Sequence, residues 1–353
     1  MKIKAVILAN EIPGDQVLWE KSCARFEERI SYRTVNLLSG NWLEEIQNDD
    51  FDILLAKPGA FSAENKKKFD ERAGVLVNHF RYRLFPSLDE ILIYENKRYL
   101  AGWLDKNNIP HPSTNVLYDR ERAGMFIESC SYPIVGKLAT GASGSGVTIL
   151  RNREDASRYI SRAFGKGLLP SSGPKLGKGK ILRRIFRKII RPGELFQRIK
   201  VYYSVLSDPQ KGFCIFQEFI PHDFEWRVVR IGNSFYAHKK LVKDGKASGS
   251  LLKEYADPPL RLLDFVKDIT DKHSFYSQAV DIFETADGRY LVNEMQCIFG
   301  QSDPYQMLVG GKPGRYLYEN NSWRFEEGMF NTNECFDERI EYVLSLFEAG
   351  EKN

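Results

Sequence analysis

Apolar and polar positions alternate with two different periods along the first 92 residues. Short apolar runs predict strands, and the stretches between them, with apolar residues every three to four positions, predict helices. Because strands that alternate with helices form parallel sheets, we predict a small α/β domain that shapes a substrate site without catalytic residues of its own. The expected strands are Lys2–Leu8, Arg33–Leu38, Phe51–Ala56 and Val75–Asn78, and the expected helices are Gly14–Ile30, Trp42–Gln47 and a helix from Ser62 to Glu71.

A second pattern is a predicted hairpin whose turn contains only small residues. Ile134–Lys137 and Val147–Leu150 have the β-branched composition of strands, and Thr140–Gly146 lies between them. A loop of this composition can direct its backbone N–H groups toward one anion, because few side chains obstruct the approach. Lys137 lies on the incoming strand. A flexible hairpin turn is the alternative interpretation, and the spacing matches neither a Walker A loop nor a dinucleotide-binding fingerprint.

Strand patterns return after residue 213 and bring acidic residues together. Asp281 and Glu294 fall on two strands that form a predicted hairpin around Asp287-Gly288. Gln296 lies two residues beyond Glu294 and therefore on the same face. Such oxygen ligands suit Mg²⁺ better than Zn²⁺. The alternative is an acidic sheet edge without a ligand. The expected strands are Cys214–Phe219, Glu225–Ile231, Phe235–Val242, Ala279–Phe283 and Tyr290–Met295.

Charge is unevenly distributed over the 353 residues. The net charge is +4, but residues 165–200 carry six Lys and five Arg against one Glu, a local charge of +10 that leaves −6 elsewhere. Within this block, Lys180–Arg191 has one apolar stripe bordered by basic residues, which is typical of a helix on an anionic membrane surface. The alternative is a helix packed on the protein with its basic face in solvent. No nucleic acid is expected, because interleaved aromatic residues are missing.

The remaining composition favours a cytoplasmic protein, peripheral at the inner membrane face if the basic stripe binds lipid. The longest apolar run near the start, Ala5–Ala9, is too short for a signal sequence. No segment approaches the roughly 20 apolar residues of a membrane span. The five cysteines are scattered without a C-x-x-C pair, which favours free thiols.

The order of these motifs resembles the ATP-grasp superfamily, most closely its carboxylate–amine ligases, including the glutamate-adding enzymes. Asn96-Lys97 opens a helix that ends at Ile109–Pro112, and the glycine hairpin follows; Gln-Glu-Phe-Ile, Glu-x-Arg, Val-Asp and Asn-Glu-x-Gln come next, up to about Asp303. The resemblance implies an α/β (α+β) fold. Its parts would be an α/β domain at 1–92, an ATP-grasp core at 93–303 with a lid at about 113–216 that includes the basic insertion 165–200, and a C-terminal segment, 304–353, that completes the core.

The resemblance also implies a role for each matching residue, with ATP and Mg²⁺ as cofactors. The family usually has Asn where this chain has Gln296. Compared with Asn, Gln keeps the amide oxygen but is one methylene longer. A further basic residue is expected near the reacting groups, either Lys239 or Lys240, with His238 a weaker candidate. The implied ligands are Lys97 and Lys137 for phosphates, Ser143, Gly144, Ser145 and Gly146 for the lid, Glu218, Phe219 and Ile220 for adenine, Glu225 for ribose, Arg227 for the transferred phosphoryl group, and Asp281, Glu294 and Gln296 for Mg²⁺.

The implied reaction joins a carboxylate to an amine through an acyl phosphate. Two alternatives stay open: an ATP-grasp kinase that phosphorylates a hydroxyl group, and a nucleotide-binding module without turnover. A membrane-bound ligase would meet a glycan-linked carboxylate or amine, such as a surface-polysaccharide precursor. An oligomer is possible.

Overall fold

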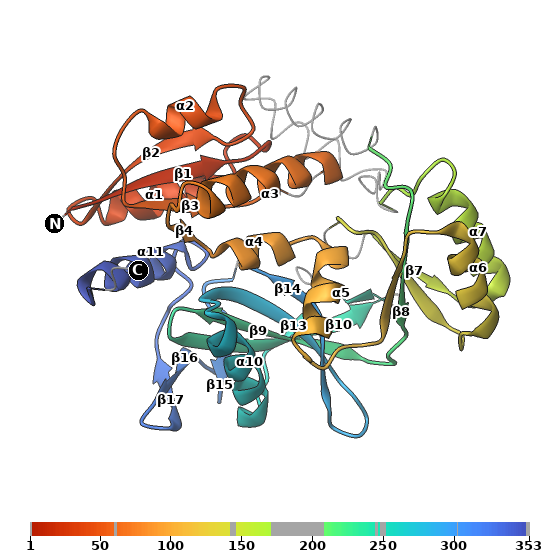
Figure 1. Ribbon diagram of the computed structural model, residues 1–353. Coiled ribbons are helices and arrows are strands. Elements are labelled where there is room, and N and C mark those ends of the chain that lie inside the picture. Colours follow the sequence, from red (N-terminus) through yellow and green to blue (C-terminus); the bar gives the residue numbers. More distant parts are fainter. Residues whose placement is uncertain are drawn as a thin grey trace, which may run out of the picture.

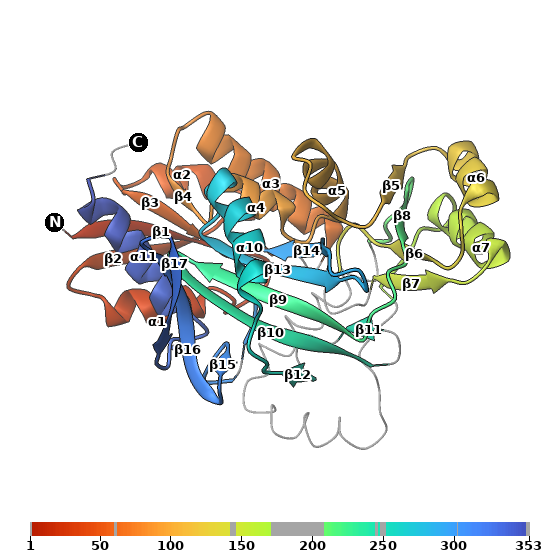
Figure 2. The ribbon, with the colours of Figure 1, turned by 90° about the horizontal axis from the view of Figure 1, so that it is seen from below.

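The computed structural model describes residues 2–59, 62–141, 146–170, 208–243, 246–247, 252–301 and 303–350. Its described strands form three sheets, one in an N-terminal domain, one in a lid and one in a central core. The N-terminal domain and the lid lie at opposite ends of the molecule, with the core sheet between them (Figures 1 and 2). None of the described helices is long and apolar enough to cross a membrane.

The N-terminal domain contains the predicted parallel sheet. Its strands run in the order β2-β1-β3-β4, and every pairing is parallel. Helices pack on the sheet because they bury apolar residues such as Trp19 and Phe69. The strands are β1 (Ile3–Ala9), β2 (Ile30–Asn36), β3 (Ile53–Ala56) and β4 (Leu84–Phe85), and the helices are α1 (Val17–Arg25), α2 (Trp42–Gln47) and α3 (Ala63–Asn78).

Two predicted elements of this domain are wrong. Val75–Asn78 is the last turn of α3 and not a strand, because Phe69, Ala73 and Leu76 continue one buried helical face. The fourth strand is instead the short β4. The predicted helix 14–30 is also too long, since α1 ends at Arg25 and Ile30 already begins β2.

The lid is a four-stranded antiparallel sheet covered by two helices. The predicted hairpin is confirmed with its expected bounds, β6 (Ile134–Lys137) and β7 (Val147–Leu150), in the sheet order β5-β8-β6-β7. Phe126 and Tyr159 of the two helices pack on Phe216 of β8. The other lid elements are β5 (Thr114–Leu117), α6 (Arg120–Ser129), α7 (Arg153–Ala163) and β8 (Cys214–Glu218).

The core is a nine-stranded sheet whose path runs β14-β13-β9-β10-β16-β15. One face, with Trp226, Val228 and Ile282, packs against apolar residues of α5 and α10. The opposite face carries a smaller apolar cluster that includes Val229 and Tyr236, and next to this cluster it carries charged groups. Its elements are α4 (Leu88–Ile93), α5 (Lys97–Lys106), β9 (Phe224–Ile231), β10 (Ser234–Lys243), β11 (Lys246–Ala247), β12 (Lys253–Glu254), α10 (Leu260–His273), β13 (Ser277–Glu284) and β14 (Tyr290–Gln296).

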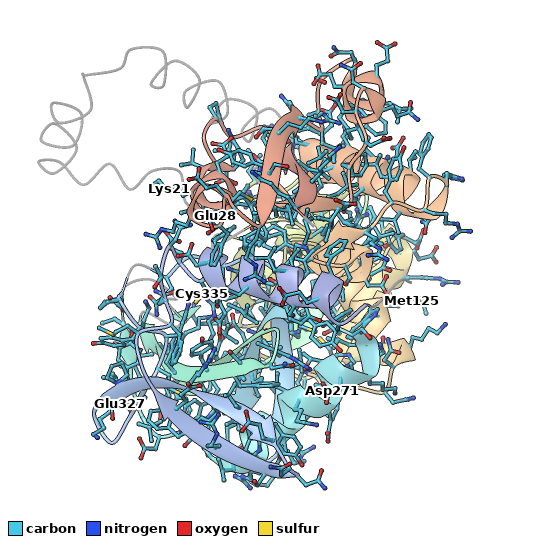
Figure 3. The ribbon with its side chains drawn as sticks, turned by 90° about the vertical axis from the view of Figure 1, so that its left-hand side faces the viewer. Lys21, Glu28, Met125, Asp271, Glu327 and Cys335 are labelled. Carbon is cyan, nitrogen blue, oxygen red and sulfur yellow. The ribbon has the colours of Figure 1, made fainter. Side chains whose placement is uncertain are left out.

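The C-terminal segment contributes to two parts of the molecule. The strands β15 (Leu308–Val309), β16 (Lys312–Glu319) and β17 (Ser322–Glu327) extend the core sheet. Helix α11 (Phe336–Glu348) returns to the N-terminal domain, where the Phe336 ring meets Trp19 edge-on at 4.8 Å. In Figure 3, α11 follows Cys335 and lies between the N-terminal elements and the core sheet. It therefore joins the two ends of the chain into one packed unit.

Candidate active site

The polar face of the core sheet carries a row of charged side chains set by strand register. Arg227 on β9 is paired with His238 on β10 and with Asp281 on β13, and Asp281 is paired in turn with Glu294 on β14. Residues that are paired across adjacent strands project from the same face. The convergence of Asp281 and Glu294 predicted from the sequence is therefore present.

Asp281 is at the centre of this row. Its carboxylate accepts two hydrogen bonds from Arg227, at 2.8 and 2.9 Å, and a third from Lys240 at 2.7 Å. Burial alone would raise the pKa of Asp281, but the two cations outweigh it and hold this pKa well below its usual range. Asp281 is thus an ionised carboxylate that is fully enclosed by the protein.

A chain of hydrogen bonds joins this cluster to the lid. Lys240 donates to Glu225 at 2.8 Å, and Asn293 donates to the other oxygen of Glu225 at 3.0 Å. The amide oxygen of Asn293 accepts a 2.8 Å bond from Lys137 of lid strand β6. Burial, with the neighbouring charge of Lys97, lowers the pKa of Lys137 to about 8. The Lys137 charge is therefore placed at the junction of lid and core with a neutral amide as partner.

Asn293 reaches the site because β14 is irregular at this point. The register shifts between Asp281, which pairs with Glu294, and Ile282, which pairs with Val292, so that Asn293 is an extra residue in the strand. Such a β-bulge re-aims a side chain that strict alternation would place on the other face. Both Asn293 and Glu294 consequently contact lysines of the site.

Lys97 lies at the edge of the site nearest β14. Its ammonium group is 3.1 Å from Glu294 and 3.5 Å from Glu95, and it donates to the carbonyl of Gly141 at 3.3 Å. Burial disfavours its charge, but the two carboxylates outweigh burial and raise the pKa of Lys97. Gln296 donates to Glu95 at 3.2 Å. The opening of α5, the start of the glycine loop and the end of β14 therefore meet here.

The two lysines that the sequence did not distinguish lie on opposite faces of β10. Lys240 belongs to the polar face, whereas the ammonium group of Lys239 is 4.3 Å from the centre of the Phe224 ring and pairs with Glu254 at 3.2 Å. Successive side chains of a strand point to opposite faces. Lys239 is therefore not part of the site, and that candidate is wrong. His238, in contrast, is buried beside Arg227 on the polar face.

The predicted adenine segment, Glu218–Ile220, connects lid strand β8 with core strand β9. The exposed Glu218 side chain accepts a 3.3 Å hydrogen bond from the backbone N–H of Ser113. This bond joins the segment that enters the lid before β5 to the segment that leaves it after β8. In the glycine loop, Gly146 accepts a 2.8 Å backbone bond from Leu138 that closes the hairpin. Ser143, Gly144 and Ser145 lie outside the described residues, as do residues 180–191.

Three further residues of the site were not predicted from the sequence. Asn293 is the first residue of the Asn-Glu-x-Gln motif, but no role was assigned to it, and Glu95 directly precedes the motif residue Asn96, so their place in or beside a motif was the available signal. Gln210 has no such signal, because it is 70 residues beyond the loop that it supports. Its amide oxygen accepts from the backbone of Ala139 and Thr140 at 2.8 and 3.1 Å, and its amide nitrogen donates to Thr140 at 2.7 Å.

The oxygen donors of this face fit a magnesium ion in kind. Asp281, Glu294 and Gln296 supply carboxylate and amide oxygens from adjacent positions of one face. The side chain of Glu294 is 22% exposed, whereas that of Asp281 is 2% exposed and shared by two cations. Over the described ranges, no group of three or more His, Cys, Asp or Glu side chains is arranged to hold a metal ion. Glu294 and Gln296 are thus the more accessible of the three predicted ligands.

The fold of the chain is similar to the folds of several solved structures. An N5-carboxyaminoimidazole ribonucleotide synthetase from Thermus thermophilus has a TM-score of 0.57 and 11% identity, with 97% of this chain and 78% of that chain covered. The N5-carboxyaminoimidazole synthetase of Staphylococcus aureus complexed with ADP has a TM-score of 0.56 and 12% identity, covering 98% and 78%. No family model matches the sequence.

One sequence relative is a phosphoribosylamine–glycine ligase from Fusobacterium nucleatum subsp. nucleatum. It is 23% identical over 88 residues, which is 25% of this chain and 21% of that protein. The chain therefore matches about a fifth of that relative's length. Together with the sheets and the lid, the structural likenesses define the class of the fold: the chain has the ATP-grasp fold.

Proposed function

We propose that the protein is an ATP- and Mg²⁺-dependent carboxylate–amine ligase. The observation that carries the proposal is the polar face of the core sheet, where Arg227, Lys240 and Glu294 lie beside Lys97 and the lid residue Lys137. The ATP-grasp fold supports it, as does the ADP bound by the S. aureus protein of the same fold. The curated relative is likewise a ligase, although the match covers a short segment.

The nucleotide would bind between lid and core. Lys97 and Lys137 would contact the phosphates, and Ser143–Gly146 would cover them with backbone N–H groups. Glu218–Ile220 would hold adenine at the lid–core connection, and Glu225 would accept hydrogen bonds from the ribose hydroxyl groups. The bond between Lys137 and Asn293 supports this assignment, because it keeps a lysine of the lid directed at the core.

The charge balance of the site supports a requirement for a metal ion. Four cations, Lys97, Lys137, Arg227 and Lys240, are accompanied by four carboxylates, Glu95, Glu225, Asp281 and Glu294. Because this set is already neutral when all groups are charged, a polyphosphate needs additional positive charge. Asp281, Glu294 and Gln296 would hold Mg²⁺, which neutralises charge on the phosphate oxygens.

The reaction would proceed in two steps. A carboxylate oxygen attacks the γ-phosphorus of ATP, so that an acyl phosphate forms and ADP leaves. The nitrogen of the amine then attacks the acyl carbon, loses a proton and displaces inorganic phosphate to form an amide. Arg227 and Lys240 would neutralise the charge that develops on the transferred oxygens, which is the main protein contribution to such transfers.

The experiment that tests the function is ADP release from ATP with a panel of carboxylates, amines and alcohols. A ligase releases ADP in a manner that depends on both an acid and an amine, and the amide is found by mass spectrometry. ADP release with an alcohol alone would instead indicate a kinase. Nucleotide binding without turnover for any pair would indicate a binding module.

Two finer predictions from the sequence stay predictions. A glycan-linked substrate and a role in polysaccharide synthesis are compatible with a ligase, and the structure adds no specific support for them. Peripheral membrane contact through residues 180–191 concerns a segment outside the described residues. Sedimentation with anionic vesicles, with Arg183, Arg184, Arg187 and Lys188 changed to Gln as the comparison, tests that contact directly.

A further inference from the structure

Glu95 is a buried carboxylate in a strained part of the backbone, and the proposed reaction gives it no role. It lies between α4 and α5, is 3% exposed and has a φ of 49°. Residues other than glycine are unfavourable in this left-handed region of the backbone, and the burial of a carboxylate adds a further free-energy cost. Such a combination persists only when surrounding contacts hold it in place, and it is concentrated at functional sites.

The contacts of Glu95 connect three separate parts of the site. One carboxylate oxygen, Oε1, accepts a hydrogen bond from the amide nitrogen of Gln296 at 3.2 Å. The other, Oε2, accepts from the backbone N–H of Gly141 at 3.3 Å and lies 3.5 Å from the ammonium group of Lys97. These partners come from the end of β14, the start of the glycine loop and the first turn of α5.

The contact with Gln296 determines which end of that amide is available to a ligand. An amide group has a donor end, NH₂, and an acceptor end, C=O. The three groups that contact the Glu95 carboxylate, which are Nε2 of Gln296, the N–H of Gly141 and the ammonium group of Lys97, are all donors, so Glu95 holds the NH₂ end of Gln296. The amide oxygen is left free to face another partner, and the neighbouring metal-ligand candidate on β14 is Glu294, two residues away on the same face.

We propose that Glu95 is a positioning residue that orients Gln296 so that its amide oxygen coordinates the divalent cation. The inference rests on the proposed function, because the cation is the one assigned to Glu294 and Gln296. It also explains the length of Gln296: an asparagine would end one methylene earlier and lose the contact with Glu95. Residues that orient a metal ligand in this way typically change metal affinity about 10- to 100-fold when they are replaced.

The test is a binding measurement that needs no substrate other than a nucleotide. The fluorescent analogue mant-ADP is titrated into the full-length protein, once with excess Mg²⁺ and once with EDTA. The ratio of the two dissociation constants measures how strongly the metal ion contributes to binding. We expect Glu95→Gln to reduce this ratio about tenfold, because a neutral amide at position 95 also offers donors and no longer selects one orientation of Gln296.

Two further variants complete the design. Gln296→Asn should cause a similar loss, and the double variant should be no worse than either single change, since both interrupt the same contact. Glu90→Gln is the matched control: Glu90 is also a buried glutamate, but it caps α4 and accepts a 2.9 Å hydrogen bond from the backbone N–H of Ser277, and its described hydrogen bonds include none to Glu294 or Gln296. It should lower thermal stability and leave the Mg²⁺ ratio unchanged.

The outcomes separate this inference from the proposed function. If the wild-type protein binds mant-ADP more tightly with Mg²⁺ and folded Glu95→Gln shows the same ratio, the positioning role is overturned and the proposed function stands. If the wild-type protein shows no Mg²⁺-dependent binding, both fail. Should Glu95→Gln not fold, Gln296→Asn decides alone, and an unchanged ratio in that variant overturns the inference.

Discussion

At the scale of single residues, the side chain of Lys137 is expected to lose its positive charge in the mildly alkaline pH range. Burial, followed by the charge of Lys97, lowers its pKa to about 8, so the side chain is protonated below this pH and neutral above it. Its hydrogen-bond partner, Asn293, is neutral and does not hold the proton in place. A bound phosphate would add a negative charge and raise this pKa.

We therefore predict that ADP affinity falls as the pH rises through about 8. Loss of a hydrogen bond from a charged donor costs about 1.5–3 kcal/mol, roughly ten- to a hundredfold in Kd. Lys137→Arg should remove this dependence, because arginine stays protonated throughout the range. Titration with mant-ADP from mildly acidic to alkaline pH, on both sides of that pKa, provides the measurement. Identical pH profiles for wild type and Lys137→Arg would contradict the assignment of Lys137.

Asp281 is expected to affect stability as well as metal binding. Asp281→Asn leaves Arg227 and Lys240 buried without their shared carboxylate, and breaking a buried ion pair costs about 3–5 kcal/mol. Because the pKa of Asp281 is lowered in the folded protein, its contribution is complete above the unfolded pKa of about 3.9 and is lost as the pH falls further.

Urea unfolding of wild type and Asp281→Asn provides the check. The difference in unfolding free energy should be constant from about pH 8 down to about 5 and should shrink below about 4. Asp287→Asn, in an exposed hairpin turn, is the control and should change stability little. Equal unfolding free energies for wild type and Asp281→Asn at neutral pH would show that the Arg227–Asp281–Lys240 cluster contributes no stability.

At the scale of elements, the alternation of β10 separates two lysines that are adjacent in sequence. Lys240 donates to Glu225 and Asp281 on the polar face, whereas Lys239 stacks on Phe224 and Trp226 on the other. We expect Lys240→Ala to reduce the turnover measured as ADP release about 100- to 1,000-fold, the usual effect of removing one charge-stabilising donor. Lys239→Ala should retain turnover close to that of wild type. A reversed or equal effect of the two substitutions would contradict this orientation of β10.

An element could be predicted from the sequence when the interactions that form it lie within its own residues. The hairpin β6–β7 follows from its own residues and was predicted with the correct bounds. The bulge at Asn293 could not be read from the alternation of β14, because it arises from pairing with β13. Val75 and Val77 favour a strand locally, but packing of Phe69, Ala73 and Leu76 on the N-terminal sheet extends α3 through them.

At the scale of the whole molecule, the site is assembled from segments far apart in sequence. Lys137 comes from the lid, Lys97 from the start of α5, and the paired charges from the core sheet. The order of motifs was sufficient to predict the fold, and most of the candidate residues that the structure describes lie close together. Gln210 and Glu95 could not be predicted, since their roles depend on how the lid, α5 and β14 come together in space.

The most direct test of the proposed nucleotide site is a crystal structure with a non-hydrolysable ATP analogue and Mg²⁺. We predict phosphate oxygens within about 2.7–3.2 Å of the ammonium groups of Lys97 and Lys137. We also predict Mg²⁺ about 2.0–2.1 Å from an oxygen of Glu294. An analogue bound elsewhere, with Lys137 still on Asn293 and Lys97 still on Glu294, would contradict the assignment.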